Sequence, residues 1–369
     1  MSSGRPCGLP AGNLQYAVKS PVLRTRRPNC GQTGLNMKPD LDYLSVDAFI
    51  ADLTGASALR AALSLGVIDR LAAGEVFAGA DAGLAMLLQL LRAGGVARER
   101  AGHWRLTDQF NQTLRYRDLL EAKLEFAAMV SGDAVERFAD LIARPAQFMR
   151  ESRLLELFDY GRCLHVTEEN LRHARRWVRL TTALTRYEAG VMLGMHDLSQ
   201  ARRMLDIGGN SGELALQSCR ANPLLLATVV DLPVVCEIGR EHVRGHAECG
   251  RIEFTAGDAL TGPLPREMDL VTFKSMLHDW PEEGVRRLLE RANECLRPGG
   301  QVLIFERGPI AVGERLPPYS LLPILLFFRS FRGPELYQRM LAEMDFEQIQ
   351  TRQVNLETPF FLLTARKRH

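Results

Sequence analysis

A histidine, an aspartate and a tryptophan stand side by side in the stretch KSMLHDWPEEG, between an apolar run and the start of a helix. The imidazole of His278 can take a proton from a hydroxyl at neutral pH, because the ordinary pKa of histidine is near ~6.5. A lone histidine at a helix entry is more often a structural residue. It becomes a candidate general base only if a ligand that needs one binds beside it.

A glycine-rich turn lies earlier in the chain, in MLDIGGNSGELALQSC. Gly208, Gly209 and Gly212 let the backbone approach a ligand closely between a strand and a helix. Such a loop also binds nicotinamide dinucleotides, so by itself it is a weak signal. Asp206, however, ends the strand just before the first glycine, where a negative charge would repel a pyrophosphate. It suits a cationic ligand with an ammonium and a sulfonium, namely S-adenosylmethionine.

Two more acids follow the next predicted strands, Asp231 in VVDLP and Asp258 in AGDAL. The carboxyl ends of parallel strands meet at one edge of a sheet, where ligands bind. Asp231 has the position expected of a carboxylate that binds ribose hydroxyls. Each acid alone could simply cap a helix. Three acids at successive strand ends, together with the glycine loop, favour a cofactor site.

The elements that must position these residues follow an alternating strand–helix pattern. The predicted strands are RMLDIG, LATVVDL, IEFTAGD, MDLVTFKS and QVLIFER. This pattern is typical of an α/β fold with a doubly wound, Rossmann-like parallel sheet. FEQIQTRQV and FFLLTAR are expected to close the sheet as an antiparallel pair.

The preceding part of the chain has helical periodicity almost throughout. Helix, helix and a short hairpin (HWRLTDQFNQTL) follow one another, which is the outline of a winged helix, and further helices are expected over 118–143, 151–160 and 167–195. Residues 1–38 contain Arg and Lys but no acid, together with glycines and prolines. They are expected to be a disordered tail or an over-long start.

Composition excludes several classes of protein. A net charge of +2 gives no general case for nucleic-acid binding. The seven cysteines are scattered and never form a C-x-x-C pair, which argues against a disulfide framework or a zinc site and favours free thiols in the cytoplasm. The longest apolar run, YSLLPILLFF, is too short to span a membrane.

Five motifs together resemble the S-adenosylmethionine-dependent O-methyltransferases of the plant caffeate and hydroxyindole type and their bacterial polyketide and phenazine relatives. They are LDIGGNSG, VVDLP, GDAL…PLP…D, K…LHDWPEE and LRPGGQVLIFE, in the order and at the spacings of that family, and the resemblance covers residues 40–369. It implies a helical, winged-helix-like dimerisation and substrate-lining domain over 39–195 and a catalytic domain over 196–369. It also implies a homodimer and an aromatic hydroxyl as the usual acceptor.

The resemblance assigns roles to single residues. His278 would be the general base and Glu306 the acid that fixes its tautomer. Asp279 is interpreted first as a helix cap and second as a catalytic helper. Including the loop residues above, the candidate cofactor-binding residues are Asp206, Gly208, Gly209, Gly212, Asp231, Leu232, Asp258, Ala259, Lys274 and Trp280. No metal site is expected.

The chain departs from the family pattern in three places. The position of a second glutamate falls on Phe331, so that either Glu306 alone orients His278 or base catalysis matters less here. Asn210 replaces the middle glycine of the loop, and asparagine tolerates left-handed backbone. A further helix of the family is missing between LAAGEVFAGAD and GLAMLLQLL.

The substrate pocket is expected to form from the long helix before the catalytic domain and from SLLPILLFFRSF. The candidates are Phe158, Trp177, Leu180, Leu184, Met192, Leu325 and Phe328. Each of them alone could equally be a core residue. Together they indicate an apolar, planar acceptor.

Three functions compete. The first is O-methylation of a small aromatic or polyketide-like metabolite. The second is C-methylation of a pigment or metabolite precursor on the same fold, for which a base at His278 matters less. The third is a winged-helix DNA-binding regulator, against which stand the near-neutral charge and the apolar character of GLAMLLQLL.

Overall fold

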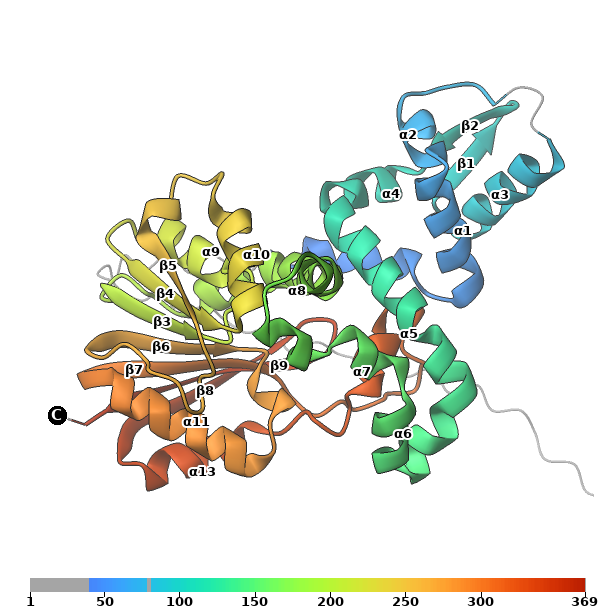
Figure 1. Ribbon diagram of the computed structural model, residues 1–369. Helices are drawn as coiled ribbons and strands as arrows, with labels where there is room; N and C mark the ends of the chain where they lie inside the picture. Colours follow the sequence, from blue (N-terminus) through green and yellow to red (C-terminus); the bar gives the residue numbers. More distant parts are fainter. Residues whose placement is uncertain (1–39, 78–80, 369) are drawn as a thin grey trace, which may run out of the picture. The chain divides into compact units, whose positions relative to one another are not determined.

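The computed structural model describes residues 40–77 and 81–368. The tail expected over 1–38 lies outside these residues. The described residues belong to one compact unit. Helices dominate its first half, and a seven-stranded sheet with helices on both faces forms its second half (Figure 1).

The first helices begin where acidic or hydroxyl side chains cap them. Asp52 accepts a hydrogen bond from Gly55 N and Asp81 accepts one from Leu84 N, which satisfies backbone donors at the helix starts. The order helix, helix, hairpin expected from the sequence is present, and residues 75–77, between α2 and α3, form no additional helix. The elements are η1 (Asp42–Phe49), α1 (Leu53–Ser64), α2 (Val67–Ala72), α3 (Ala82–Ala93), the antiparallel strands β1 (Ala97–Arg100) and β2 (His103–Leu106), and α4 (Asp108–Thr113).

Two long helices connect this region to the sheet. Thr167 caps the second of them by accepting a hydrogen bond from Asn170 N. That helix has 28 residues, which corresponds to about 40 Å at ~1.5 Å per residue. The segment contains η2 (Leu114–Tyr116), α5 (Arg117–Ala143), α6 (Pro145–Glu151), α7 (Arg153–Leu157), η3 (Tyr160–Leu164) and α8 (Glu168–Met195).

The large sheet has the strand order β5-β4-β3-β6-β7-β9-β8. β5, β4, β3, β6 and β7 are parallel, while β9 pairs antiparallel with β7 and with β8. The prediction of an antiparallel closing pair is therefore confirmed. The strands are β3 (Arg203–Ile207), β4 (Leu226–Asp231), β5 (Ile252–Ala256), β6 (Met268–Lys274), β7 (Leu296–Arg307), β8 (Phe346–Asn355) and β9 (Pro359–Lys367).

Alternate residues of the strands pack on opposite faces of this sheet, as the pleat requires. Leu303 and Phe305 of β7 join the core that includes residues of the helix after β3, whereas Val302 and Ile304 join the core under the helix before β7. Figure 1 shows α11 and α13 together along one side of the sheet. The remaining helices are α9 (Glu213–Ala221), α10 (Pro233–Val243), η4 (Cys249–Arg251), η5 (Leu277–Asp279), α11 (Glu282–Cys295), η6 (Tyr319–Leu321), α12 (Leu322–Leu326) and α13 (Pro334–Glu343).

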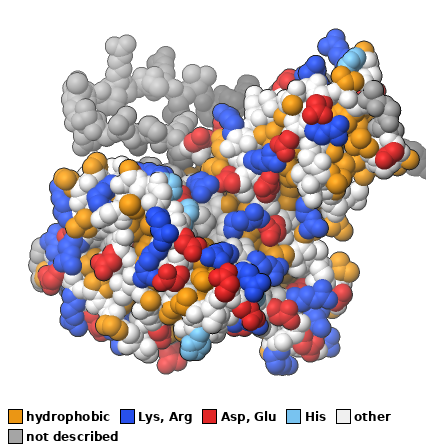
Figure 2. Space-filling view, turned by 45° about the horizontal axis from the view of Figure 1, so that its top comes forward, with side chains coloured by type: hydrophobic (Ala, Val, Ile, Leu, Met, Phe, Trp, Pro, Cys, Tyr) orange, Lys and Arg blue, Asp and Glu red, His pale blue; other side chains and the backbone are white. Residues whose placement is uncertain are grey.

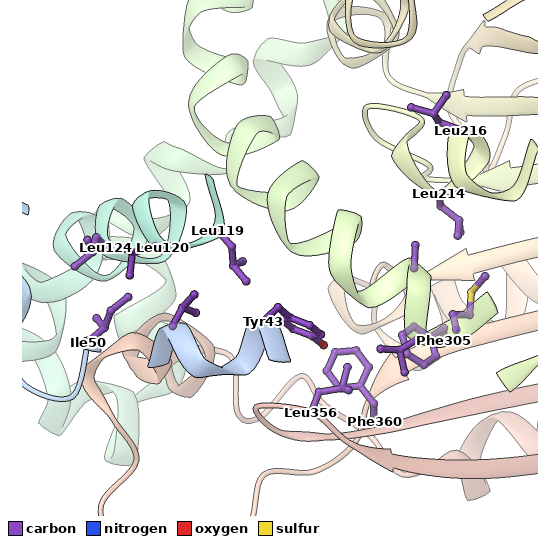
Figure 3. Close-up of a cluster of buried hydrophobic side chains, with 14 of the residues drawn as sticks. Tyr43, Ile50, Leu119, Leu120, Leu124, Leu214, Leu216, Phe305, Leu356 and Phe360 are labelled. Atoms are coloured by element: carbon purple, nitrogen blue, oxygen red, sulfur yellow. The ribbon is translucent and has the colours of Figure 1, made fainter. Parts of the chain in front are cut away.

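One apolar core runs from the N-terminal helices to the sheet. Figure 3 shows Tyr43 of η1 beside Phe360 of β9. Phe305 of β7 lies to the right of Phe360, and Leu119 of α5 lies on the opposite side of Tyr43. Each of these four side chains is at least nine-tenths buried. No helix among the described residues is long and apolar enough to cross a bilayer.

The two edge strands of the sheet differ. β5 has five residues, whereas β8 has ten and carries a register shift between Glu347 and Gln350. Gln348 within this bulge has a φ of 52°, in the left-handed region. The bulge therefore interrupts the regular backbone of the longer edge.

Candidate active site

The glycine loop between β3 and α9 is shaped by its neighbours. Gly208 has a φ of 67°, and a Cβ on Gly209 would lie 2.5 Å from Oδ2 of Asp206. Asp206 is 1% exposed, and Thr272 donates to its Oδ1 at 2.6 Å. Its Oδ2 has no hydrogen-bond partner among the described residues. Burial raises the pKa of Asp206 to about 7, against the opposing effects of the Thr272 hydrogen bond and the charge of Lys274.

Asp231, at the end of β4, is tied to the same loop. Its two oxygens accept hydrogen bonds from the backbone N–H groups of Asn210, at 2.8 Å, and Leu232, at 2.7 Å. Burial nevertheless raises the pKa of Asp231 to about 6. Asn210 has a φ of 55°, as its tolerance of left-handed backbone allows. α8 supports the loop from outside, because Thr182 Oγ1 lies 2.8 Å from Oγ of Ser211.

The imidazole of His278 is held by Glu306, as the sequence predicted. Its Nδ1 lies 2.9 Å from Oε2 of Glu306, a fully buried carboxylate at the end of β7. The other oxygen of Glu306 accepts from the N–H groups of Met276 and Leu277, each at 2.7 Å. Nδ1 is thus the donor, which leaves the lone pair on Nε2. Burial opposes the imidazolium, but the charges on Glu306 and Asp279 outweigh it and raise the pKa of His278.

The turn between β6 and α11, which carries His278, packs against the glycine loop. A Cβ on Gly208 would lie 2.8 Å from Cε of Met276, two residues before the histidine. On another side, the ring of Phe331 lies 5.2 Å from the imidazole. The position expected for a second glutamate is therefore occupied by a buried aromatic ring that packs against the base.

Asp279 does not cap the following helix, which corrects the first interpretation of this residue. The N-cap of α11 is Pro281, and α11 has no side-chain capping bond. Residues 277–279 form the short helix η5 instead, so that Asp279 ends one helix rather than starting the next. Its Oδ2 accepts a hydrogen bond from the hydroxyl of Tyr160 at 3.1 Å, and its Oδ1 lies 3.5 Å from Nε2 of His278. Sequence reasoning missed Tyr160, because no spacing links residues 119 positions apart.

An aromatic cluster adjoins this carboxylate. The ring of Phe158 lies 5.9 Å from that of Trp177 and 6.0 Å from that of Phe327, and Tyr160 lies 5.7 Å from Trp177. Of the predicted pocket residues, four belong to the hydrophobic core around this cluster, namely Phe158, Trp177, Leu180 and Phe328. Phe327 was not predicted, although it stands next to Phe328 in the same apolar run.

The other three predicted pocket residues lie apart from this cluster. Leu184 and Met192 pack into the core between η1, α9 and the sheet, and Met192 is fully buried. The reason is the length of α8, whose successive turns meet different neighbours. Leu325 lines a separate cavity of about 220 Å³ beside Glu357 and Pro359.

The remaining candidate cofactor-binding residues differ in their exposure and in the contacts that they already make. Asp258 is exposed, and its oxygens accept from Leu260 N and Thr261 Oγ1. It caps its own turn, which is not a helix start, so the alternative role of a helix cap does not apply to Asp258. Leu232 packs against the core around the aromatic cluster, and Ala259 and Trp280 pack against the core beneath α11. Within the described ranges, no group of three His, Cys, Asp or Glu side chains could hold a metal ion.

Lys274, also a cofactor candidate, belongs to a buried ion network. Its ammonium donates to Glu188 of α8 and, at 3.0 Å, to Thr185. Glu188 also accepts from Arg307 at 2.6 Å, and Arg307 donates to Glu357 at 2.8 Å. These four charged side chains are at most 8% exposed. Burial opposes ionisation, but Lys274 and Arg307 lower the pKa of Glu188 to about 2.

A comparison with protein families matches the part of the chain that contains most of the candidate site residues. Residues 149–325 match the family model described as O-methyltransferase domain. This match covers just under half of the chain. The matched residues extend from α6 to α12 and contain the glycine loop, His278 and Glu306.

Two curated proteins are similar to part of the chain. A 3-hydroxy-5-methyl-1-naphthoate 3-O-methyltransferase of Streptomyces sahachiroi is 39% identical over 139 residues, which is 38% of this chain and 40% of that protein. An acetylserotonin O-methyltransferase of Mus musculus molossinus is 35% identical over 171 residues, or 44% of each chain. The chain thus spans less than half the length of these two relatives.

The fold itself matches over a wider range. The structure of human N-acetylserotonin methyltransferase in complex with S-adenosylmethionine has a TM-score of 0.65 and 24% sequence identity, covering 85% of this chain and 94% of that chain. The fold is that of a class I methyltransferase, which confirms the predicted α/β architecture.

Proposed function

We propose that this protein is an S-adenosylmethionine-dependent O-methyltransferase that methylates a hydroxyl of a small aromatic or polyketide-like metabolite. One observation carries the proposal. A histidine whose Nδ1 is bound by a buried glutamate stands on a turn that packs against the glycine loop, with Nε2 left as the acceptor. That arrangement supplies a general base beside a cofactor loop.

The residues present fit this cofactor. Asp206 offers a buried carboxylate oxygen without a partner, and its raised pKa is what an unpaired anion produces. A ligand with positive charge would stabilise the ionised form. Gly208, Gly209 and Gly212 would let the ligand approach the backbone, and Asp231 would bind ribose hydroxyls. When bound, S-adenosylmethionine supplies a methyl group activated by a sulfonium.

The chain's own contribution to the reaction is to orient the acceptor and move a proton. Nε2 of His278 takes the proton of the acceptor hydroxyl, so that the oxygen can attack carbon. Glu306 keeps the proton of Nδ1 in place and stabilises the imidazolium that forms. Glu306 can remain ionised because His278 and two backbone donors lower its pKa against the effect of burial.

The acceptor class follows from the surroundings of the base. Phe158, Tyr160 and Phe327 offer aromatic faces on the side of Asp279. Planar rings stack or make edge contacts with such faces. Two carboxylates near His278 would repel an acidic acceptor, so the preferred substrate is a neutral aromatic alcohol. The relative's name, a 3-hydroxy-5-methyl-1-naphthoate 3-O-methyltransferase, supports a polycyclic aromatic hydroxyl compound as acceptor; its naphthoate carries a carboxylate, so it does not support the neutral charge.

Transfer of a labelled methyl group tests the proposal. The protein is incubated with labelled S-adenosylmethionine and a panel of phenols, hydroxynaphthalenes, hydroxyquinones and enolisable carbon acids. Label on oxygen of an aromatic acceptor is the expected result. Label only on carbon, or no transfer to any acceptor, contradicts it. C-methylation is not favoured, since the matching domain is an O-methyltransferase domain.

A low-salt DNA shift assay addresses the regulator hypothesis. Figure 2 shows acidic and basic side chains interspersed over the face in view, rather than a continuous basic surface. Leu88 and Leu91 of α3, the helix that would have to read DNA, are buried. We expect no salt-dependent binding.

We also propose that the enzyme is a cytoplasmic homodimer and that its domains meet near residue 195. The five cysteines in the described part of the chain are free thiols, as in a reducing compartment. The boundary is supported by the end of α8 at Met195, before β3. Light scattering of the full chain tests the dimer.

The pH dependence of turnover should report the state of His278. A base must be neutral to accept a proton, and its raised pKa places the acid limb of kcat/KM above the ordinary histidine value of ~6.5. Glu306→Gln removes the negative charge and should move this limb to lower pH while reducing turnover. Glu343→Gln is the control, because Glu343 forms an exposed pair with Arg286. An unmoved limb in Glu306→Gln contradicts the assigned coupling.

Gly209→Ala should destabilise the protein and weaken cofactor binding. The new Cβ would lie 2.5 Å from Oδ2 of Asp206 and 2.9 Å from Cγ1 of Val229. Overpacking of this kind costs about 1–3 kcal/mol. Calorimetric titration with S-adenosylmethionine and thermal unfolding measure the two effects. Gly245→Ala is the control, since a Cβ there meets nothing within 4 Å. Equal affinities in the two variants would contradict the proposed cofactor loop.

A further inference from the structure

The second carboxylate beside the base comes from an unexpected place. Phe331 packs on the imidazole where the related proteins are expected to carry a glutamate. Asp279 instead brings Oδ1 to 3.5 Å from Nε2 of His278. Glu306 and Asp279 therefore approach opposite nitrogens of one imidazole ring. Nε2 is the atom that gains the proton, so Asp279 faces the charge that develops.

Tyr160 is the residue that holds Asp279. Its hydroxyl donates to Oδ2 at 3.1 Å, which leaves Oδ1 for the side of the imidazole. The aspartate side chain is 32% exposed and Tyr160 is 41% exposed, so neither is fixed by burial alone. The ring of Tyr160, however, is anchored against Phe158 and Trp177. The aromatic cluster thus sets the direction of the hydroxyl.

We propose that Tyr160 is a positioning residue that holds Asp279 against His278, so that this carboxylate stabilises the proton taken up by Nε2. The proposal rests on the proposed O-methyl transfer. In that step the O–H bond of the acceptor breaks, and its electron pair forms the bond to the methyl carbon. The carbon–sulfur pair goes to sulfur, and the proton goes to Nε2. The imidazolium is then stabilised by Glu306 at one nitrogen and by Asp279 at the other.

The other charges around the imidazole do not supply this stabilisation. Arg307 on β7 opposes protonation of His278 and is engaged by Glu188 and Glu357. Arg332, after Phe331, donates to the backbone carbonyls of Leu277 and Trp280. The negative groups that face His278 are Glu306 and Asp279.

Two readouts on the full chain test the inference. The first is an NMR titration of ring-labelled histidine, with the His278 signal assigned by its loss in His278→Ala. Asp279→Asn should lower the pKa of His278 by about 1. Tyr160→Phe keeps the aromatic ring and should also lower the pKa of His278, by less than Asp279→Asn does. It should cause no further change in the Asp279→Asn background, because the two residues act through one contact.

The second readout is turnover. Tyr160→Phe should reduce kcat about tenfold, the loss expected for one charge-assisted hydrogen bond, while the KM of the acceptor changes less than kcat. Tyr187→Phe is the matched control, because it removes a tyrosine–aspartate hydrogen bond between Tyr187 of α8 and Asp118 of α5. It should alter neither readout.

An unchanged pKa of His278 in Tyr160→Phe overturns the inference, even if thermal stability falls. The inference is also overturned if Tyr160→Phe changes the pKa of His278 by the same amount in the wild-type protein and in the Asp279→Asn variant. Failure of the wild-type protein to methylate any acceptor would instead refute the proposed function. The titration still decides the role of Tyr160 in that case, because it needs no turnover.

Discussion

His278→Ala is expected to lose about 10²–10⁴-fold in turnover on a hydroxyl acceptor, with cofactor affinity unchanged. Nε2 of His278 is the proposed proton acceptor, and the contact of Nδ1 with Glu306 leaves it free for that role. The side chain makes no hydrogen bond to the glycine loop in the described structure, so its removal should spare the cofactor. Single-turnover transfer of labelled methyl and calorimetric titration separate the two effects.

Two further variants separate the loss of the base from a loss of folding. Removing the imidazole leaves Glu306 buried, although two backbone donors remain bound to it. His278→Asn retains an amide that can donate to Glu306, so it should fold well and still lose turnover. His103→Ala, an exposed histidine on β2, should remain fully active. If His278→Ala and His278→Asn both keep nearly the full rate, His278 is not the general base and has only a structural role in this turn.

Glu188→Ala is expected to lower the free energy of unfolding by about 3–5 kcal/mol. Lys274 and Arg307 both lose their common partner, and both are nine-tenths or more buried. An uncompensated buried cation is far more costly than a broken surface pair. Urea unfolding followed by circular dichroism measures the change, with Glu188→Gln as a milder variant of the same size.

A surface acid provides the comparison for this second prediction. Glu241 forms a pair with Arg175 in which both side chains are more than one-third exposed. Glu241→Ala should therefore change stability by about 1 kcal/mol or less. If the Glu188→Ala and Glu241→Ala variants unfold at the same urea concentration, the buried ion network that links α8 to the sheet contributes little to the free energy of unfolding.

Local patterns were enough to predict the elements that carry the chemistry. Strand–helix alternation and the glycines predicted β3, the loop and α9, because these depend on a few neighbouring residues. The partnership of His278 with Glu306 was also predictable. An acid at the end of a buried strand needs a partner, and β6 and β7 are neighbours in the sheet.

Contacts between distant segments were not predictable in the same way. Tyr160, at the start of η3, meets Asp279 of η5 only through the tertiary fold, and nothing near Tyr160 in the sequence encodes that contact. The interpretation of Asp279 as a cap failed for a related reason, since the chain folds into η5 before α11 begins. Lys274 likewise finds Glu188 through the packing of α8 on the sheet.

The bulge in β8 has a consequence for the protein in concentrated solution. An exposed, regular edge strand is a template on which another chain can add a strand and aggregate. Here the longer edge is interrupted at Gln348 and carries the charges of Glu347 and Arg352, and the opposite edge, β5, is only five residues long. Both ends of the sheet therefore resist growth into a continuous intermolecular sheet, and copies of this chain should meet through helical surfaces rather than through strand edges.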